Sequence, residues 1–389
     1  MAFPEHFVKL ITECITSPTF SVCVNGESCG YFKGAKGLRQ GESISPYLFT
    51  IAMDVFTQML TSKFNTNHIG FHPQASNPQV PLLAFADDIM IFFDGKKTSL
   101  ENISTVLQQF SILSGLSMNK DKTNLYLAGV NQDETSQFHS LGFNLGSLPI
   151  HYLGLPLIHR KLRISEYRPL IDKITGKFSS WTARALSFPG RKELISSVIY
   201  GIINLWASAF ILPKGCVKII ESLCTRFLCC GDISKKTHAK VAWSSLCLPK
   251  EKGGLGFRSI NRWNKTLCLK LIWRLLTAGD SLWADWLRNN KIKDEVFWQI
   301  DAVKQTSWIC RTILHLRSLA LIFLRCHVGN GQTTSFWNNS WTPFGHLLDY
   351  MGTTGPSQTG VPLRGTVAQA CSPNGWIIRP TRSLQAEAL

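Results

Sequence analysis

The sequence predicts an α+β fold in which short antiparallel hairpins and helices are followed by a mainly helical region. Up to Leu157, apolar stripes at helical spacing alternate with short runs that end at glycine or aspartate. After Leu157, apolar residues recur mainly at the helical period. The chain has 389 residues, 44% of them hydrophobic and 17% charged, which is enough for two or three globular domains with substantial cores.

The first elements expected are a helix over residues 5–15 and a hairpin. Residues 20–24 and 28–32 flank an Asn25-Gly26 pair, which favours positive φ at both turn positions. Gly37 to Gly41 is expected to form a tight loop. A helix should then run to about Ser62, with Ser45 as its N-cap, and an exposed connection should cover residues 65–81.

Residues 82–93 place two adjacent carboxylates, Asp87 and Asp88, inside an apolar run. Paired like charges between strands are tolerated at a turn or beside a cation, and neighbouring side chains of a strand point to opposite faces. The segment is therefore predicted to be a hairpin with the aspartates at its tip. Two interpretations stay open from these residues alone: an ordinary acidic turn, or a tip at which Asp87 holds a divalent cation.

The remaining elements follow from the same patterns. An amphipathic helix is expected over residues 100–114, ending at Gly115, with short strands near residues 125–128 and Tyr152. The later helices are expected near residues 165–181, 191–210, 217–228 and 260–276. Gly253-Gly254-Leu255-Gly256-Phe257 is expected to be a turn, because no strand precedes it and no Lys-Ser/Thr follows.

The positive charge is concentrated in the middle of the chain. Residues 151–278 contain 22 Lys and Arg against 6 Asp and Glu, whereas residues 1–150 contain 9 against 12. A basic block of this kind indicates a polyanion partner, because each cation that meets a phosphate releases condensed counterions. We expect Lys235, Lys236 and Lys240 to contact nucleic acid; a solvated helical surface is the alternative. Tryptophans within the block could stack on bases or pack in a core.

The cysteines and the N-terminus indicate a reducing compartment. The 12 cysteines include no Cys-x-x-Cys pair, and residues 1–6 lack the basic start and apolar run of a secretory signal. We expect a protein of the nucleus or cytoplasm that is not secreted, with no structural zinc at Cys224, Cys229, Cys230, His238 and Cys247. The uncharged residues 194–213 contain four polar side chains, so we expect a buried helix rather than a membrane partner.

Three further segments surround the Asp-Asp hairpin in a specific order. Gly37-Leu38-Arg39-Gln40-Gly41 lies upstream, Asn119-Lys120-Asp121-Lys122-Thr123 lies downstream, and Tyr152-Leu153-Gly154 follows. In this order and spacing, the segments resemble the palm of reverse transcriptases, and more narrowly the enzymes of plant non-LTR (LINE-type) retrotransposons. The resemblance extends from about Phe7 to about Trp341.

The resemblance implies a domain organisation. Residues 1–157 would form a partial reverse-transcriptase palm, an antiparallel hairpin sheet with helices. Residues 158–280 would form a basic helical thumb-like domain that grips the duplex, and residues 281–350 a Trp-rich mixed region. Residues 351–389 are rich in Gly, Pro and Ser, and we expect them to be a poorly ordered tail.

The resemblance also implies the chemistry and its residues. The family adds deoxynucleoside triphosphates to a DNA primer along an RNA template, with two Mg²⁺ ions that stabilise the attacking and leaving oxygens. By this resemblance, Asp87 and Asp88 are catalytic metal ligands, and Lys122 protonates the leaving pyrophosphate. The positions that match the nucleotide- and template-binding loop are Arg39, Gln40 and Gly41. Those that match the primer-positioning hairpin are Tyr152, Leu153 and Gly154.

One feature of the family is not found in its usual place. The palm uses a further aspartate from an earlier strand, and residues 1–53 contain no aspartate. We therefore expect a chain truncated within the palm, with weak Mg²⁺ binding and little or no polymerase activity of its own. The alternatives are a non-catalytic basic protein that binds RNA or DNA, a reverse transcriptase of the group II intron maturase type, and a remnant without function.

Overall fold

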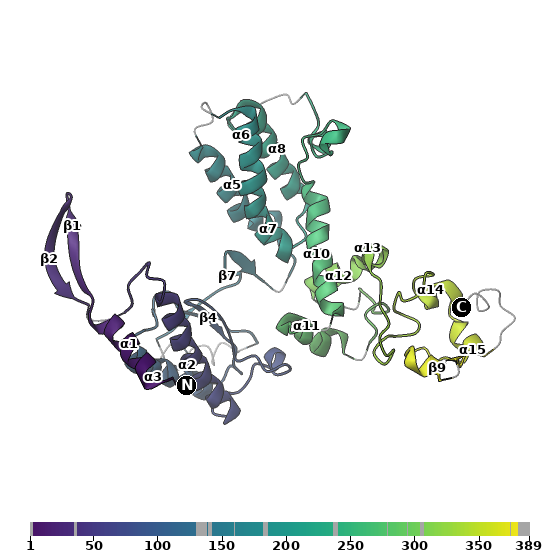
Figure 1. Ribbon diagram of the computed structural model, residues 1–389, viewed down its shortest axis with the longest axis horizontal. Coiled ribbons are helices and arrows are strands. Elements are labelled where there is room, and N and C mark those ends of the chain that lie inside the picture. Colours follow the sequence, from purple (N-terminus) through teal and green to yellow (C-terminus); the bar gives the residue numbers. More distant parts are fainter. Residues whose placement is uncertain are drawn as a thin grey trace. The chain divides into compact units, whose positions relative to one another are not determined.

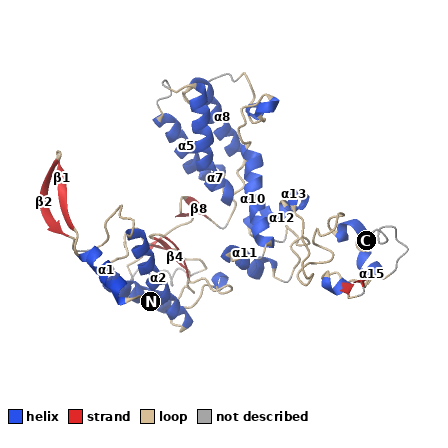
Figure 2. Ribbon diagram, viewed as in Figure 1, coloured by secondary structure: helices blue, strands red, loops and turns tan. Residues whose placement is uncertain are grey.

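The chain folds into two compact units, residues 1–157 (unit 1) and residues 158–389 (unit 2). The computed structural model (Figure 1) describes residues 3–34, 37–129, 138, 142–158, 160–181, 186–235, 240–277, 279–293, 295–303, 307–373 and 375–379. Helices are the main regular elements of both units, and the strands of the described residues occur as short pairs (Figure 2). The α+β class predicted from the sequence is confirmed.

Unit 1 begins with a helix and a hairpin, as predicted. Helix α1 (Glu5–Thr16) is followed by strands β1 (Thr19–Val24) and β2 (Glu27–Lys33). Asn25 and Gly26 form the turn with φ of 52° and 90°, the left-handed values that a tight two-residue turn requires. No residue of α1 is buried, so its apolar stripe faces solvent in unit 1.

The core of unit 1 lies where two helices meet one hairpin. Helices α2 (Ser45–Asn65) and α3 (Lys97–Ser114) pack together, and strands β3 (Leu82–Phe85) and β4 (Asp88–Ile91) lie against them (Figure 1). Their shared apolar cluster contains Phe56, Leu60, Phe64, Ile69, Ile103, Val106 and Phe110.

The segment between α2 and β3 differs from the exposed connection expected. It contains the short 3-10 helix η1 (Pro73–Ala75), and Ile69 is fully buried in the core cluster. Its backbone is anchored as well: the Asp94 N–H donates to the Gly70 carbonyl at 2.9 Å. The segment was expected to be exposed because it is mostly polar, but its Ile69 side chain belongs to the core.

Two small strand pairs complete unit 1. Strands β5 (Asn124–Leu125) and β6 (Asn144–Leu145) pair in parallel. Strands β7 (Ile150–Tyr152) and β8 (Leu155–Leu157) form an antiparallel hairpin. Its turn residues, Leu153 and Gly154, both have positive φ, at 51° and 78°.

Unit 2 is mainly helical. Its first part contains η2 (Ile164–Tyr167), α5 (Arg168–Ser180), α6 (Phe188–Leu194), the π-helical η4 (Ile195–Ile199), α7 (Tyr200–Ala209), α8 (Lys214–Cys230), α9 (Trp243–Leu246) and η5 (Lys250–Lys252). Its second part contains α10 (Ile260–Leu276), α11 (Leu282–Leu287), the π-helical η6 (Arg288–Ile292), α12 (Trp308–His315) and α13 (Arg317–Phe323). In the described residues, no helix combines the length and apolar character needed to cross a bilayer.

Aromatic side chains form much of the core of the helical bundle α5–α8. The rings of Phe178 on α5 and Phe227 on α8 lie 4.6 Å apart, and those of Tyr167 and Trp206 lie 5.6 Å apart. All four residues are buried. The uncharged segment 194–213, which was expected to be a buried helix, therefore supplies one wall of this core.

A buried asparagine joins α10 to the bundle. The Asn264 side chain is 3% exposed; its Oδ1 accepts the Leu212 N–H at 2.8 Å. Its Nδ2 donates to the carbonyls of Ala207 at 2.7 Å and Phe210 at 2.8 Å. These are the backbone groups that the end of α7 leaves without helical partners. Asn264 therefore satisfies the helix terminus and fixes the crossing of α7 and α10.

The C-terminal residues form structure where a disordered tail was expected. Helices α14 (Leu347–Met351) and α15 (Gly355–Thr359), η7 (Ala368–Ala370) and strands β9 (Cys371–Ser372) and β10 (Gly375–Trp376) are present. They surround the fully buried Trp337, whose Nε1 donates to the Val361 carbonyl at 3.2 Å. The expectation is therefore wrong for residues 351–373 and 375–379, because this Gly/Pro-rich segment covers an aromatic core.

The loop between η5 and α10 has a close backbone approach at Gly254. A Cβ at Gly254 would overlap the backbone carbonyl of Leu248, while Gly176 on α5 faces open space. We expect Gly254→Ala to lower the free energy of unfolding by about 1–3 kcal/mol, because backbone cannot move aside easily. Gly176→Ala is the matched control and should raise it by about 0.5–1 kcal/mol. Urea titration followed by tryptophan fluorescence reports on unit 2, since every tryptophan lies after residue 157.

Candidate functional site

The register of the β3–β4 hairpin determines where Asp88 lies. Leu82 pairs with Ile91, and Phe85 pairs with Asp88, so these pairs lie on opposite faces of the hairpin. Leu82 and Ile91 pack against the core of α2 and α3. Asp88 is consequently presented on the face that points away from this core, and it is exposed.

The turn of the hairpin presents the second carboxylate. Ala86 and Asp87 form a two-residue turn between Phe85 and Asp88, and Asp87 is exposed. No hydrogen bond or ion pair of either aspartate side chain is present among the described residues. Ala86 has φ of 51°, a left-handed value that costs a residue with a Cβ roughly 1–2 kcal/mol. The hairpin that packs on the core therefore ends in a strained turn, and the two carboxylates at this turn are available to a ligand.

The charge at the first hairpin influences a phenol of the β7–β8 hairpin. Tyr152 at the end of β7 has a raised pKa, first because of burial and then because of the negative charge of Asp88. The two side chains are thus close enough to interact electrostatically, although 64 residues separate them in the chain. A predicted metal ligand thus influences the ionisation of a predicted primer-positioning residue.

The loop over residues 37–41 is tied to the start of α2. The Ser45 hydroxyl donates to the Arg39 carbonyl at 2.8 Å, so Ser45 is the first helical residue rather than the N-cap expected. The Arg39 guanidinium pairs with Glu42 at 3.4 Å and lies over the Phe20 ring at 5.5 Å. Gly41 has φ of 88°, which explains why glycine is needed there.

The other predicted residues are placed separately. Gln40 and Lys122 are exposed, and the Lys122 N–H donates to Asn119 Oδ1 at 3.1 Å. Lys235 and Lys240 are exposed in unit 2, and Lys236 lies outside the described residues. In the described residues of unit 1, no hydrogen bond or ion pair links the Gln40 or Lys122 side chain to Asp87 or Asp88.

The donor atoms at the hairpin tip limit which metal centre the site can hold. Carboxylate oxygens are suitable Mg²⁺ ligands, and Mg²⁺ commonly uses one or two carboxylates together with water. Across the described parts of the chain, however, no group of three or more His, Cys, Asp and Glu side chains could share a metal ion. Asp87 and Asp88 therefore supply oxygen atoms of the kind that Mg²⁺ prefers, and the described residues place no third such side chain with them.

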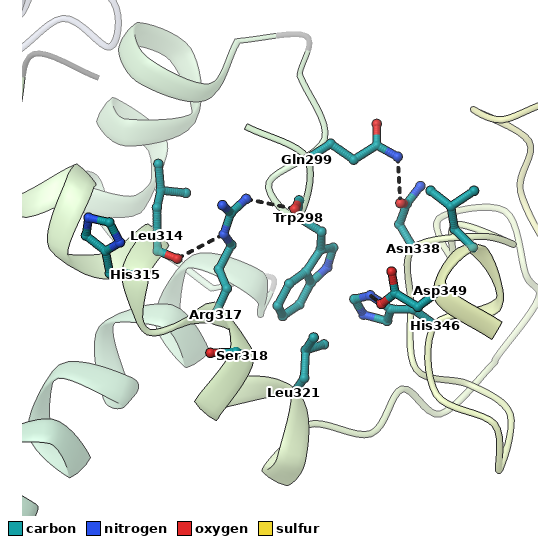
Figure 3. Close-up of a pocket in the computed structure, with 11 residues that line it drawn as sticks. Trp298, Gln299, Leu314, His315, Arg317, Ser318, Leu321, Asn338, His346 and Asp349 are labelled. Atoms are coloured by element: carbon teal, nitrogen blue, oxygen red, sulfur yellow. Dashed lines mark hydrogen bonds and ion pairs between the residues drawn. The ribbon is translucent and has the colours of Figure 1, made fainter. Parts of the chain in front are cut away.

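A cavity of about 360 Å³ lies in unit 2, and no pattern in the sequence indicated it. Residues of the 298–299 segment, α12, α13 and α14 line it (Figure 3). Arg317 lies in its wall and donates to the carbonyls of Trp298 at 2.7 Å and Leu314 at 2.9 Å. Because carbonyls hold this guanidinium in place, Arg317 supports the wall of the cavity.

His346 is a titratable group of this wall whose pKa is lowered by burial. Its ring packs edge-on against Trp298 at 4.8 Å, and its buried Nε2 has no hydrogen-bond partner among the described residues. Burial lowers the pKa of His346, and the Asp349 carboxylate, 3.6 Å from Nδ1, partly opposes this effect. The folded protein therefore favours the neutral imidazole.

The pKa of His346 gives unit 2 a pH-dependent stability. As the pH falls below the ordinary histidine value of 6.5, the unfolded chain takes up a proton that the folded chain resists. We expect unit 2 to lose stability as the pH is lowered through this value, and His346→Gln to reduce this loss. Asp349→Asn should increase the loss, because the carboxylate supports the protonated imidazole. Denaturant midpoints from tryptophan fluorescence test this; equal slopes in all three proteins would contradict it.

The positive φ of Ala86 leads to a prediction about the stability of the β3–β4 hairpin. Ala86→Val should destabilise the β3–β4 hairpin by about 1 kcal/mol or more, because a β-branched residue is strained at positive φ. Ala84→Val is the matched control two residues away, in a strand that tolerates β-branched residues. Ala86→Gly should be tolerated. Hydrogen exchange of the β3–β4 amides is the measurement, and equal protection in both valine variants would be inconsistent with a strained turn.

Comparisons with known proteins agree with this geometry. The family described as reverse transcriptase (RNA-dependent DNA polymerase) matches residues 1–157. An uncharacterized mitochondrial protein of Arabidopsis thaliana is 30% identical over 135 residues, which cover 34% of this chain and 88% of that protein. A retrovirus-related Pol polyprotein from a type-2 retrotransposable element of Drosophila melanogaster is 26% identical over 148 residues, 38% of this chain.

A putative ribonuclease H protein of Arabidopsis thaliana is 28% identical over 198 residues, 50% of this chain. The chain spans 32% of that protein and 13% of the Drosophila polyprotein. The residues matched by the family include both hairpins and the loop before α2. The chain belongs to the reverse transcriptases of non-LTR retrotransposons and is of the plant-like type.

Proposed function

We propose that unit 1 carries part of the catalytic palm of an RNA-directed DNA polymerase. The observation that supports this most directly is the exposed Asp87-Asp88 tip, and the charge of Asp88 acts on Tyr152 of a second hairpin. In the parent reaction, a primer 3′ oxygen attacks the α-phosphate of a deoxynucleoside triphosphate and pyrophosphate leaves. The strained turn at Ala86 supports this proposal, because such backbone is often kept where it orients functional groups.

Asp87 and Asp88 are the residues that would hold Mg²⁺. The ion supplies charge stabilisation for phosphate oxygens when it is bound. Tyr152, Leu153 and Gly154 would position the primer terminus, since their hairpin has a tight turn and the charge of Asp88 acts on Tyr152. In this proposal, Arg39, Gln40 and Gly41 face the nucleotide and template base, and Lys122 supplies the proton for pyrophosphate.

We further propose that the chain alone has little or no polymerase activity. Residues 1–53 contain no aspartate, so the loop at residues 37–41 is not preceded by the acidic residue that the family uses. Only two carboxylates are then available to coordinate a cation, and water must fill its other coordination positions. Binding is therefore expected to be weak. This proposal is about the activity of the 389-residue chain by itself. The reaction proposed above for the palm stays the same.

A second function has support of its own. Residues 151–278 carry an excess of 16 positive charges, and unit 2 folds around its own cores. We propose that unit 2 binds RNA or DNA without catalysis, with Lys235, Lys236 and Lys240 among the contacts. Binding of this kind weakens steeply with salt, because it depends on counterion release.

Primer extension on an RNA template tests the catalytic proposal. We expect the chain and its Asp87→Ala/Asp88→Ala variant to show the same background of product, since too few carboxylates are present to hold two ions. A product that the double change abolishes would contradict the proposed inactivity and would identify the aspartates as catalytic.

Metal binding tests the site itself. Mn²⁺, followed by electron paramagnetic resonance, should bind the chain weakly, and Asp87→Asn/Asp88→Asn should reduce this binding. Asp121→Asn is the control, because it removes an exposed carboxylate of unit 1 that is not part of the β3–β4 hairpin. Equal Mn²⁺ binding by all three proteins would exclude a metal site at Asp87 and Asp88.

A further inference from the structure

The structure separates the tryptophans of the basic block into packed and free side chains. Trp206 is buried, and Trp181 packs edge-on against Phe178. Trp243 stacks on Phe257 with ring centres 4.9 Å apart, and Trp263 donates to Asn204 Oδ1 at 2.7 Å. These four tryptophans therefore have structural partners.

Trp273 on α10 is the fifth tryptophan of the block, and its environment differs. Its residue surface is 56% exposed, and no ring or cation contact of its indole is present among the described residues. The indole offers a large flat π surface, and here that surface is neither buried nor stacked on another ring. Trp273 is therefore a candidate for stacking on a flat ligand.

Basic side chains share the exposed side of α10 with this indole. The helix contains no Asp or Glu, and its four basic side chains are exposed: Arg262, Lys265, Lys270 and Arg274. No ion pair of these four is present in the described parts of the chain. Lys270 lies three residues before Trp273, a spacing that places two side chains side by side on a helix. The exposed face thus combines free positive charge with a free aromatic ring.

The opposite side of α10 fixes which residues face solvent. Ile260, Asn264, Cys268, Ile272 and Leu275 are buried, and the Asn264 hydrogen bonds anchor this side to the end of α7. The helix cannot turn about its axis without breaking these bonds. The basic residues and Trp273 are therefore held in one fixed strip.

We propose that this strip, made of Arg262, Lys265, Lys270, Trp273 and Arg274, binds single-stranded nucleic acid. The cations neutralise backbone phosphates, and the Trp273 indole stacks on one unpaired base. From residue 262 to residue 274 the strip is about 18 Å long, at about 1.5 Å per residue. The proposal deepens the nucleic-acid-binding function proposed for unit 2 and rests on it.

The aromatic ring favours a single strand over other polyanions. A duplex hides the faces of its bases in the stack, whereas an unpaired base offers a π surface to an aromatic side chain. An acidic protein partner would match the charge but would give no specific role to an indole between cations. The stacking contribution is thus the property that separates these partners.

Fluorescence anisotropy with a labelled single-stranded RNA, measured on the full chain, tests the proposal. We expect Trp273→Ala to weaken binding by about five-fold to 100-fold, because stacking on one base has an effect of this size. Trp273→Phe should retain part of the affinity. Changing all four cations to Gln should lower the slope of log K against log salt by about 0.7 for each phosphate that is no longer neutralised.

Two controls match these changes. Phe323→Ala removes an aromatic side chain that is 70% exposed on α13, and it should leave RNA affinity unchanged. The second control removes the same charge from unit 1 by changing four lysines together to Gln: Lys9, Lys33, Lys97 and Lys120. The slope of log K against log salt should fall by less in this variant than in the variant of the four α10 cations. Helical content and urea midpoints of every variant show whether unit 2 remains folded.

The results for the Trp273 variant and for the unchanged chain test different proposals. If the unchanged chain binds RNA and Trp273→Ala binds equally well, the strip on α10 is excluded while nucleic-acid binding by unit 2 stands. Equal losses for single-stranded and duplex RNA would also overturn the stacking role of Trp273. If the unchanged chain binds no RNA, both proposals fail.

Discussion

The alternation of side chains along β3 and β4 is the constraint on which the candidate site depends. Leu82 and Ile91 must face the helices α2 and α3, because they contribute to the core of unit 1. A shift of the register by one residue would exchange the two faces, expose these side chains and bury Asp88. Apolar packing on one face thus determines that a carboxylate is available on the other.

Local backbone conformation then brings the functional groups into position. Gly41, Ala86 and Leu153 each adopt positive φ, and each lies in a loop or turn that the family resemblance assigns to nucleotide, metal or primer. Two of the three carry a Cβ, so the conformation is unfavourable for them in isolation. Strand pairing and the anchored start of α2 hold the turns in this conformation.

Much of unit 1 could be predicted from local signals. The Asn25-Gly26 turn, the Asp-Asp hairpin and the helix end at Gly115 each depend on a few adjacent residues, and all three are present. The influence of the Asp88 charge on Tyr152 and the hydrogen bond from Ser45 to Arg39 depend on tertiary packing, which short sequence patterns do not record. In unit 2, helical periodicity identifies the main helices, whereas the Gly/Pro-rich C-terminal segment has too few apolar residues to indicate that Val361 and Ala370 are buried with Trp337. The cavity beside His346 could not be predicted either, because its lining residues between 298 and 349 meet only through tertiary packing.

Asn264 has a consequence beyond satisfying the end of α7. Successive residues of a helix differ by about 100° around its axis, so a rotation of α10 by one position would remove the amide from its three backbone partners. The buried amide therefore selects one angular setting of the helix. Whatever α10 recognises, it must meet the same side chains in the same order, which makes its surface a preorganised template rather than an adaptable one.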